Sequence, residues 1–169
     1  MFALSARQIN LGLFLVCVGL LITAYFMQLV MGLEPCPLCM MQRLAVALVG
    51  VVALVGALLN PRALGVRIIG AVTLLSAIAG MALSSRQLWL QHLPADKVPE
   101  CGPGLEYMLE VFPLLEVIQI AIRGTGDCAE VQWTFLGLSI PGWTLLAFIA
   151  MAAVAIMQIA RPNSASIPK

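Results

Sequence analysis

The sequence predicts an all-α membrane protein, a bundle of four transmembrane helices with a long outer loop that carries a short amphipathic helix. Two observations predict this class. The 169-residue chain is 62% hydrophobic and only 10% charged, with a mean hydropathy of +1.02, whereas soluble domains are about 25% charged. The apolar residues also gather in four long runs that one water-facing core could not bury. We expect a single membrane domain over residues 1–169.

Each apolar run is long enough to cross a bilayer, because a hydrocarbon core about 30 Å thick needs roughly 20 apolar residues per helix. The predicted helices cover residues 11–33, 40–60, 66–90 and 140–160. The first run is longer than the apolar core of a signal peptide, and no small-residue cleavage site follows it. We therefore expect the first helix to be retained in the working protein.

Small residues recur every four positions on two of the predicted helices. Ser76, Gly80 and Ser84 form one such stripe, and Ala53 and Ala57 form a shorter one. Stripes of this kind let helix backbones approach closely in a membrane. Chance offers the same spacing in a chain rich in alanine and glycine, so both interpretations remain open at this point.

Charged residues separate into two groups, which predicts the orientation of the helices. Short loops rich in Lys and Arg stay in the cytoplasm. Five bases without a single acid fall on one side, namely Arg7, Arg62, Arg67, Arg161 and Lys169. All eight acids fall on the other side, namely Glu34, Asp96, Glu100, Glu106, Glu110, Glu116, Asp127 and Glu130. We expect both termini and the 60–65 loop in the cytoplasm, and the loops at about 34–39 and 91–139 outside. The net charge of +1 gives no reason to expect a nucleic-acid partner.

The long outer segment contains its own structural signals. Residues 94–104 are rich in Pro, Gly and charge and are expected to be mobile, and residues 105–123 are predicted to form an amphipathic helix along the membrane surface. Pro113 predicts a kink or two short pieces. The apolar face of this helix would hold Leu105, Met108, Leu109, Phe112 and Leu115. Three tryptophans, Trp89, Trp133 and Trp143, are expected at the outer face as an aromatic belt.

Four of the five cysteines, Cys36, Cys39, Cys101 and Cys128, fall on the predicted outer side, where disulfides persist. Cys17 lies within the first apolar run and is expected to be structural. Four thiolates could bind zinc, but exported thiols are usually oxidised before they meet metal, so we expect no metal site. A Cys101–Cys128 bridge would close a long loop and stabilise it by roughly 3–4 kcal/mol. A Cys36–Cys39 bridge would stabilise very little, so its C-x-x-C spacing favours redox chemistry between two exchanging disulfides.

Two arginines lie near the predicted outer helix ends. Arg43 follows Cys39 by four residues, which places the two side chains about 6 Å apart on one helix face. A guanidinium there would favour the thiolate and could donate a hydrogen bond to the carbonyl of an apolar electron acceptor. The alternative is an arginine that extends to lipid headgroups. Arg86 presents the same choice on the third helix.

Taken together, these features resemble the DsbB family of bacterial inner-membrane proteins. The resemblance rests on four membrane helices, the C-x-x-C followed by Arg43, and the run G-D-C-A-E-V-Q-W-T-F-L-G-L at residues 126–138. It extends from about Leu11 to Ala160. It implies an enzyme that reoxidises the periplasmic dithiol oxidase DsbA and passes two electrons to a membrane quinone, either ubiquinone or menaquinone. Such a protein-dithiol:quinone oxidoreductase supports disulfide formation in exported proteins from the bacterial inner membrane.

The resemblance also implies residue roles. Cys101 would form the mixed disulfide with DsbA and Cys128 would be its loop partner. Cys36 and Cys39 would form the second disulfide, with Cys39 facing the quinone ring and Arg43 in the quinone site. Some family members carry a histidine near the outer end of the third helix. Gln87 occupies that position here, beside Arg86, so these two are the candidates for the third-helix part of the quinone pocket.

Two alternatives remain open from the sequence. One is a membrane protein without catalytic activity, whose outer loop is stapled by disulfides. The other is a DsbB-like enzyme that serves a dedicated oxidase partner in place of a general DsbA.

Overall fold

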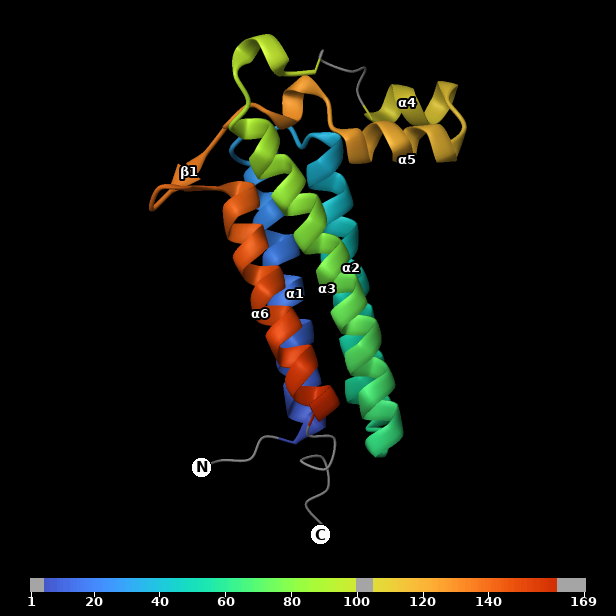
Figure 1. The fold of residues 1–169 in the computed structure, drawn as a ribbon. Helices are drawn as coiled ribbons and strands as arrows, with labels where there is room; N and C mark the ends of the chain where they lie inside the picture. The colour runs from blue at the N-terminus through green and yellow to red at the C-terminus, as the bar shows by residue number, and fades with distance from the viewer. Residues whose placement is uncertain (1–4, 100–104, 161–169) are drawn as a thin grey trace.

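The computed structural model describes residues 5–99 and 105–160, and four long helices dominate it (Figure 1). These are α1 (Ala6–Leu29), α2 (Pro37–Leu59), α3 (Ala63–Gln91) and α6 (Ile140–Ala160). Each is long and apolar enough to cross a membrane. The predicted four-helix class is confirmed, and the chain is a multi-pass membrane protein.

The helix ends follow local capping chemistry and differ by a few residues from the predicted bounds. Ser5 and Gln8 form a capping box, in which the Gln8 N–H donates to Ser5 Oγ at 3.3 Å and the Ser5 N–H donates to Gln8 Oε1 at 3.0 Å. This box starts α1 at Ala6. Pro37 takes the first position of α2, where its missing N–H costs nothing and its φ is already helical. The second helix therefore starts inside the C-x-x-C and places Cys39 on its first turn.

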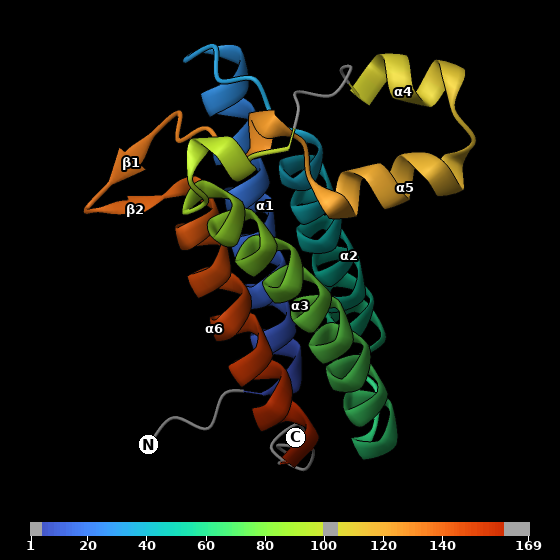
Figure 2. The same cartoon turned by 45° about the horizontal axis from the view of Figure 1, so that its top comes forward.

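Packing between the long helices runs in the order α1, α2, α3, α6 (Figure 2). The central core contains residues from α1, α2, α3 and α6, including Leu13, Val49, Ala77 and Phe148. By contrast, α1 and α6 make few direct contacts with each other. One side of the bundle is therefore loosely closed, and this matters for the site described below.

Small residues form the close helix contacts, as one of the two sequence interpretations proposed. A Cβ atom on Gly80 would lie 2.3 Å from the ring of Phe148 on α6, so only glycine fits there. Ser76 and Ser84 are buried along the same helix, and Ala53 and Ala57 are buried on α2.

A buried hydrogen bond joins α1 to α6 at the end of the bundle where the two chain termini lie (Figure 1). Gln158 Nε2 donates to Asn10 Oδ1 at 2.8 Å, and both side chains are buried. Because a polar group in an apolar interior needs a partner, the pair ties the two helices together at this end. Towards the opposite end no comparable bond is present between α1 and α6 among the described residues.

The segments beyond the bundle all lie at the end opposite the termini (Figure 1). They comprise η1 (Ala95–Lys97), α4 (Leu105–Val111), α5 (Leu114–Arg123), η2 (Gly126–Cys128), β1 (Thr134–Phe135) and β2 (Leu138–Ser139). The predicted helix over 105–123 is divided at Pro113 into α4 and α5, which contact each other and project sideways from the end of the bundle. Of its proposed apolar face, Met108 is buried but Leu115 is exposed.

A small antiparallel hairpin, which the sequence did not predict, leaves the bundle on the side away from α5 (Figures 1 and 2). Thr134 pairs with Ser139 and Phe135 with Leu138. Leu136 and Gly137 form the turn, with φ values of 52° and 80°, so both take the left-handed conformation that two-residue hairpins need. The indole of Trp143 donates to the carbonyl oxygen of Phe135 at 3.1 Å and so fixes the hairpin to α6.

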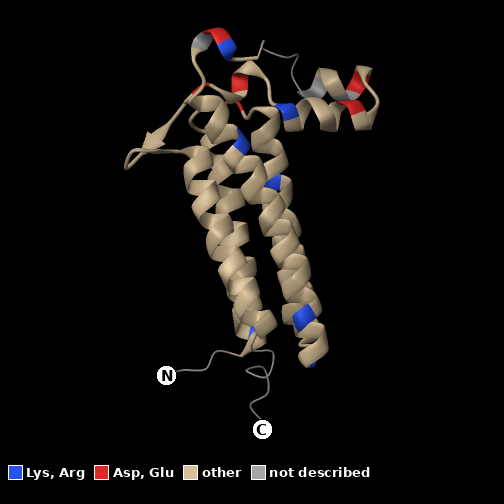
Figure 3. Cartoon of the chain, viewed as in Figure 1, with Lys and Arg blue, Asp and Glu red and all other residues tan. Residues whose placement is uncertain are grey.

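The charged residues of the described segments are separated along the bundle (Figure 3). The acids gather at the end that carries α4, α5 and the hairpin, whereas Arg7, Arg62 and Arg67 lie towards the other end. Cys101, Glu100, Arg161 and Lys169 lie outside the described residues. The sequence-based separation of charge is thus also a separation in space.

Candidate active site

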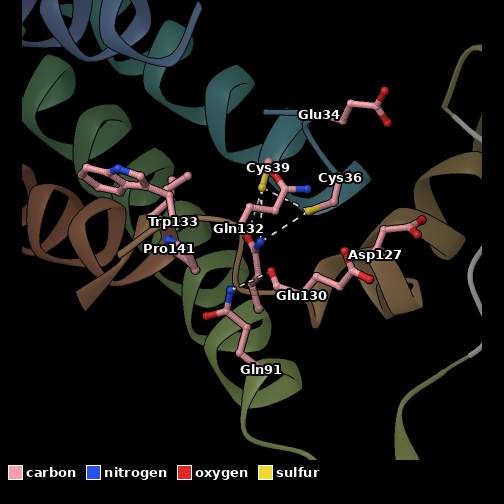
Figure 4. Close-up of a pocket in the computed structure, with 11 residues that line it drawn as sticks. Glu34, Cys36, Cys39, Gln91, Asp127, Glu130, Gln132, Trp133 and Pro141 are labelled. Atoms are coloured by element: carbon pink, nitrogen blue, oxygen red, sulfur yellow. Dashed lines mark hydrogen bonds between the residues drawn. The ribbon is translucent and has the colours of Figure 1, made fainter. Parts of the chain in front are cut away.

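Two cysteine sulfurs lie together at the start of α2. Cys36 is the residue that caps the helix, and Cys39 is on its first turn. Their Sγ atoms are 3.1 Å apart, and the Cys36 thiol donates to Cys39 (Figure 4). Cys36 is buried and Cys39 is half-buried. The C-x-x-C turn therefore holds two thiols within reach of disulfide formation.

Cys128 packs against the same pair from a distant part of the chain. It is fully buried in a small cluster with Cys36, Leu38 and Leu90. Gly124 allows this approach, because its φ is +80° and a Cβ there would lie 2.4 Å from the Leu90 side chain. The segment after α5 is therefore held against the first turn of α2 and the last turn of α3.

Hydrogen bonding shifts the pKa values of Cys36 and Cys128 in opposite directions. The neighbouring Cys36 thiol and, to a smaller extent, the backbone N–H groups of Leu38 and Thr125 favour the Cys128 thiolate through hydrogen bonding. These bonds outweigh the effect of burial and lower the pKa of Cys128 to about 6. The same bonds, first to Cys128 and then to Cys39, raise the pKa of Cys36. The pKa of Cys128 is thus lowered while that of Cys36 is raised.

Two buried glutamines complete the surroundings of the sulfurs. Gln87 of α3 directs its Nε2 at Cys39 Sγ, 3.2 Å away, and at Cys36 Sγ, 3.4 Å away. Its Oε1 accepts a 2.7 Å hydrogen bond from Gln42 Nε2 on α2. Gln42 was not among the residues that the sequence analysis predicted for the site.

A large cavity of about 580 Å³ lies beside Cys39, between the outer halves of α1, α2 and α6. The hairpin and the loop before it form one more wall. Most of its walls are apolar, including Leu20, Leu21, Met27, Val46, Leu146 and Ala147, and its polar lining includes Gln28, Cys39, Gln42, Arg43 and Thr144. Cys36 does not line it. Three of its lining residues, Phe135, Trp143 and Leu146, are 53%, 38% and 47% exposed, so the cavity reaches the surface of the protein.

Arg43 lines this cavity one helical turn after Cys39. It is half-buried. Its guanidinium donates to Gln28 Oε1 and to the carbonyl oxygen of Ala24, 3.1 Å away, and lies 5.2 Å from the centre of the Tyr25 ring. These contacts tie the Arg43 guanidinium to α1.

Comparison with known proteins decides the family. The family model described as "Disulfide bond formation protein DsbB" matches residues 6–158. The chain belongs to the DsbB family. It is 55% identical to "Disulfide bond formation protein B" of Hahella chejuensis over 161 residues, and this aligned stretch covers 95% of this chain and 98% of that protein. The protein of the same name from Marinobacter nauticus is 54% identical over 161 residues, covering 95% and 96% of the two chains. The family resemblance drawn from the sequence is confirmed.

The two third-helix candidates for the quinone pocket of a DsbB-family protein lie in different surroundings. Gln87 contacts the sulfurs and lines a small pocket of about 30 Å³ with Cys36 and Cys39. Arg86 lines neither cavity. Its guanidinium donates to the carbonyl oxygen of Arg123 at 3.0 Å and stacks over the Trp89 ring at 4.4 Å. Arg86 thus contacts the end of α5, on a part of the molecule away from the cavity.

The tryptophans likewise fall into two groups. Trp133 and Trp143 flank Phe135, with ring centroids 5.9 and 6.1 Å from its ring, and all three line the large cavity. Trp89 packs with Arg86 instead.

A polar residue inside an apolar run is the signal that could have pointed to Gln42 and Gln28. Phe135 gave no such signal, because its position depends on the hairpin.

Proposed function

We propose that this protein reoxidises a DsbA-type dithiol oxidase and passes the two electrons to a membrane quinone. The observation that carries the proposal is the order of the three sulfurs. Cys36 lies between Cys128 and Cys39, and of these three residues only Cys39 lines the large apolar cavity. This order gives electrons an entry at Cys128 and an exit at Cys39.

The entry step is a thiol–disulfide exchange, in which one S–S bond forms as another breaks. The thiolate of the reduced oxidase attacks Cys101 in a Cys101–Cys128 disulfide, which forms a mixed disulfide and releases Cys128 as thiolate. The low pKa of Cys128, about 6, favours this release because a lower pKa makes a thiol a better leaving group. Cys101 lies outside the described residues, and its role here follows the family resemblance.

The second exchange moves the electrons to the cavity. Cys128 attacks Cys36 in the Cys36–Cys39 disulfide, so that a Cys36–Cys128 bond forms and Cys39 leaves as thiolate. The second thiol of the oxidase then breaks the mixed disulfide and releases the oxidised partner and Cys101. Cys101 next attacks Cys128, which restores the outer disulfide and leaves Cys36 and Cys39 reduced.

The residues around the large cavity fit a quinone. A volume of about 580 Å³ is in the usual range for small-molecule sites, and its apolar walls suit a ring and an isoprenoid tail. Its opening towards lipid, where α1 and α6 make few contacts, suits a ligand that is dissolved in the membrane. When bound, a quinone supplies an acceptor for two electrons and two protons. Arg43 would donate to a ring carbonyl, and Cys39 presents its sulfur to the ring as Cys36 and Cys39 return to the disulfide.

A quinone also satisfies the energetic requirement. DsbA is itself a strong oxidant, near −120 mV, so its reoxidation needs an acceptor of higher potential, and each 30 mV of difference is worth about 1.4 kcal/mol. The separation of acids from bases along the bundle supports a periplasmic location for the redox end in a bacterial inner membrane, with both chain termini in the cytoplasm.

The test uses the purified full chain in detergent with reduced DsbA and a soluble ubiquinone or menaquinone analogue, followed by quinone absorbance. The wild type should consume quinone, and Cys39→Ser should not. Cys17→Ser is the matched control, because Cys17 is buried between α1 and α2 and touches neither cavity. No quinone loss with the wild type, or full activity in Cys39→Ser, would contradict the proposal. A stapled protein without catalytic activity would also form no mixed disulfide with DsbA, and a dedicated enzyme would accept only its own partner.

A further inference from the structure

We propose that Gln42 and Gln87 act as a fixed amide pair, in which Gln42 orients Gln87 so that its N–H groups stabilise the Cys39 thiolate. In the reaction proposed above, on which this inference rests, Gln87 touches the reacting sulfur and Gln42 is its positioning residue, and neither would serve as a contact for the quinone carbonyl. The pair joins α2 to α3 directly behind the active disulfide. Gln42 is 4% exposed and Gln87 is 3% exposed, so water does not compete for their hydrogen bonds.

The chemistry of the amide group determines which end of the Gln87 side chain faces the sulfurs. A glutamine side chain has one acceptor end and one donor end. Gln42 Nε2 donates to the acceptor end of Gln87 at 2.7 Å, which brings the donor end closest to the sulfurs. The Cys39 thiol also donates to Gln87 Oε1, at the longer distance of 3.6 Å. Gln87 Nε2 then lies 3.2 Å from Cys39 Sγ and 3.4 Å from Cys36 Sγ. In the reverse orientation Gln87 would present its oxygen to the sulfurs, which suits a thiol but repels a thiolate.

The exchange reaction requires this donor. When Cys128 attacks Cys36, the leaving group is the Cys39 thiolate, and a buried anion is costly unless hydrogen bonds reach it. Arg43 is on the same helix, but its bonds run to Gln28 and to Ala24 on α1. Among the described side chains, Gln87 is the one from another helix that donates to Cys39 Sγ.

The place of Gln87 in the fold separates this role from quinone binding. Gln87 lines the small pocket with both sulfurs and does not line the large cavity. Gln42 does reach the large cavity. Its Nε2, however, is bonded to Gln87. The two amides therefore connect the sulfur side of the site to the cavity side through one hydrogen bond.

The test measures the thiolate directly and needs neither DsbA nor quinone. In a Cys36→Ser background Cys39 cannot form its usual disulfide, and its rate of alkylation by iodoacetamide at fixed pH is followed by mass spectrometry of the Cys39 peptide. Loss of a hydrogen bond to a charged group should lower the thiolate population, so Gln87→Met should slow alkylation roughly ten- to hundredfold. Gln42→Met should slow it less, because Gln87 is then free to turn.

Gln42→Glu is the sharper variant. A carboxylate at position 42 accepts only, so it would draw the donor end of Gln87 towards itself and leave the Gln87 oxygen facing the sulfurs. Alkylation should then be slower than in Gln42→Met. Gln91→Met is the matched control on the same helix, because Gln91 lines the same small pocket but bonds Ser139 and Glu130 and touches no sulfur. It should react like the parent.

Equal alkylation rates in the parent, Gln87→Met and Gln42→Glu would overturn the proposal. If Gln87→Met does not yield folded protein, the Gln42 pair of variants decides the matter alone. Failure of the quinone assay together with slowed alkylation would leave the amide pair intact and reject the proposed function. A working quinone assay with unchanged alkylation rates would keep the proposed function and reject the role of the amide pair.

Discussion

Cys36 packs in one buried cluster with Cys128, which follows a different outer segment and is fully buried. This contact makes the sulfur at the tip of α2 the meeting point of the two outer segments. Because the Cys36 thiol donates to Cys39 at 3.1 Å, one residue lies between the sulfur on the proposed entry side and the sulfur on the proposed exit side. The predictions below begin with this contact.

The low pKa of Cys128 predicts a characteristic pH profile of alkylation. In a Cys101→Ser protein that has been reduced before the measurement, Cys128 is a free thiol. A group with a pKa of about 6 is mostly thiolate above that pH, so its alkylation rate should rise up to about pH 7 and then level off. Replacing Cys36 with Ala in this protein removes the neighbouring thiol that does most to lower the Cys128 pKa, and should move the midpoint upwards. A midpoint above pH 8 in the Cys101→Ser protein would contradict the hydrogen bonding that lowers this pKa.

Arg43 should act on the quinone more than on the protein partner. Arg43→Met removes the charged donor of the large cavity, and losing a hydrogen bond of this kind costs roughly 1.5–3 kcal/mol. We therefore expect the apparent KM for the quinone analogue to rise about tenfold or more, with a small change in the KM for DsbA. An unchanged quinone KM would return Arg43 to a role at the lipid headgroups.

Arg86 should instead hold α5 in place. Arg86→Ala removes the hydrogen bond to the Arg123 carbonyl and the stacking on Trp89. Amide hydrogen exchange in residues 114–123 should become faster, while the quinone KM stays at the wild-type value. A raised quinone KM with unchanged exchange would support the quinone-pocket role that the sequence suggested for this residue.

Asn10 and Gln158 should be energetically coupled. Asn10→Leu or Gln158→Leu leaves one polar side chain buried without its partner, which should cost about 1–2 kcal/mol of unfolding free energy. The double variant should cost less than the sum of the two, because it leaves no orphaned partner. Unfolding in mixed detergent micelles measures all three, and strictly additive effects would show that the bond contributes nothing.

Gly80 should tolerate no larger residue. Gly80→Ala would push a methyl group into the Phe148 ring, so we expect a loss of about 1–3 kcal/mol in unfolding free energy. Gly19→Ala is the matched control, since nothing lies within 4 Å of its added Cβ. It should leave stability unchanged or slightly raise it, because alanine is the better helix former.

Much of this fold could be predicted from the sequence, because hydropathy and charge act over whole segments. Segment hydropathy predicts the four helices and their order. Segment charge predicts the separation of Arg7, Arg62 and Arg67 from the acids. Helix starts depend on single residues, and so the prediction for α2 missed that Pro37 opens it. The hairpin at residues 134–139 was missed for a similar reason, since Leu136 and Gly137 are not a typical turn pair.

The site could be predicted only in part. The C-x-x-C spacing and Arg43 are local patterns, and both lie where the pattern placed them, at the start of α2. The contact between Cys36 and Cys128 is set by Gly124 and by the packing of Leu38 against Leu90, which no local pattern encodes. Gln42 was overlooked because its role depends on Gln87, a residue on another helix.

The most direct test of the proposed relay is the disulfide pattern after one exchange in the absence of quinone. The fully oxidised protein is mixed with a reduced DsbA variant that keeps only its attacking cysteine, then alkylated and mapped by mass spectrometry without reduction. We predict a peptide that joins Cys36 to Cys128, together with alkylated Cys39 and a mixed disulfide at Cys101. A Cys36–Cys39 disulfide that remains intact while Cys128 is alkylated would contradict the relay.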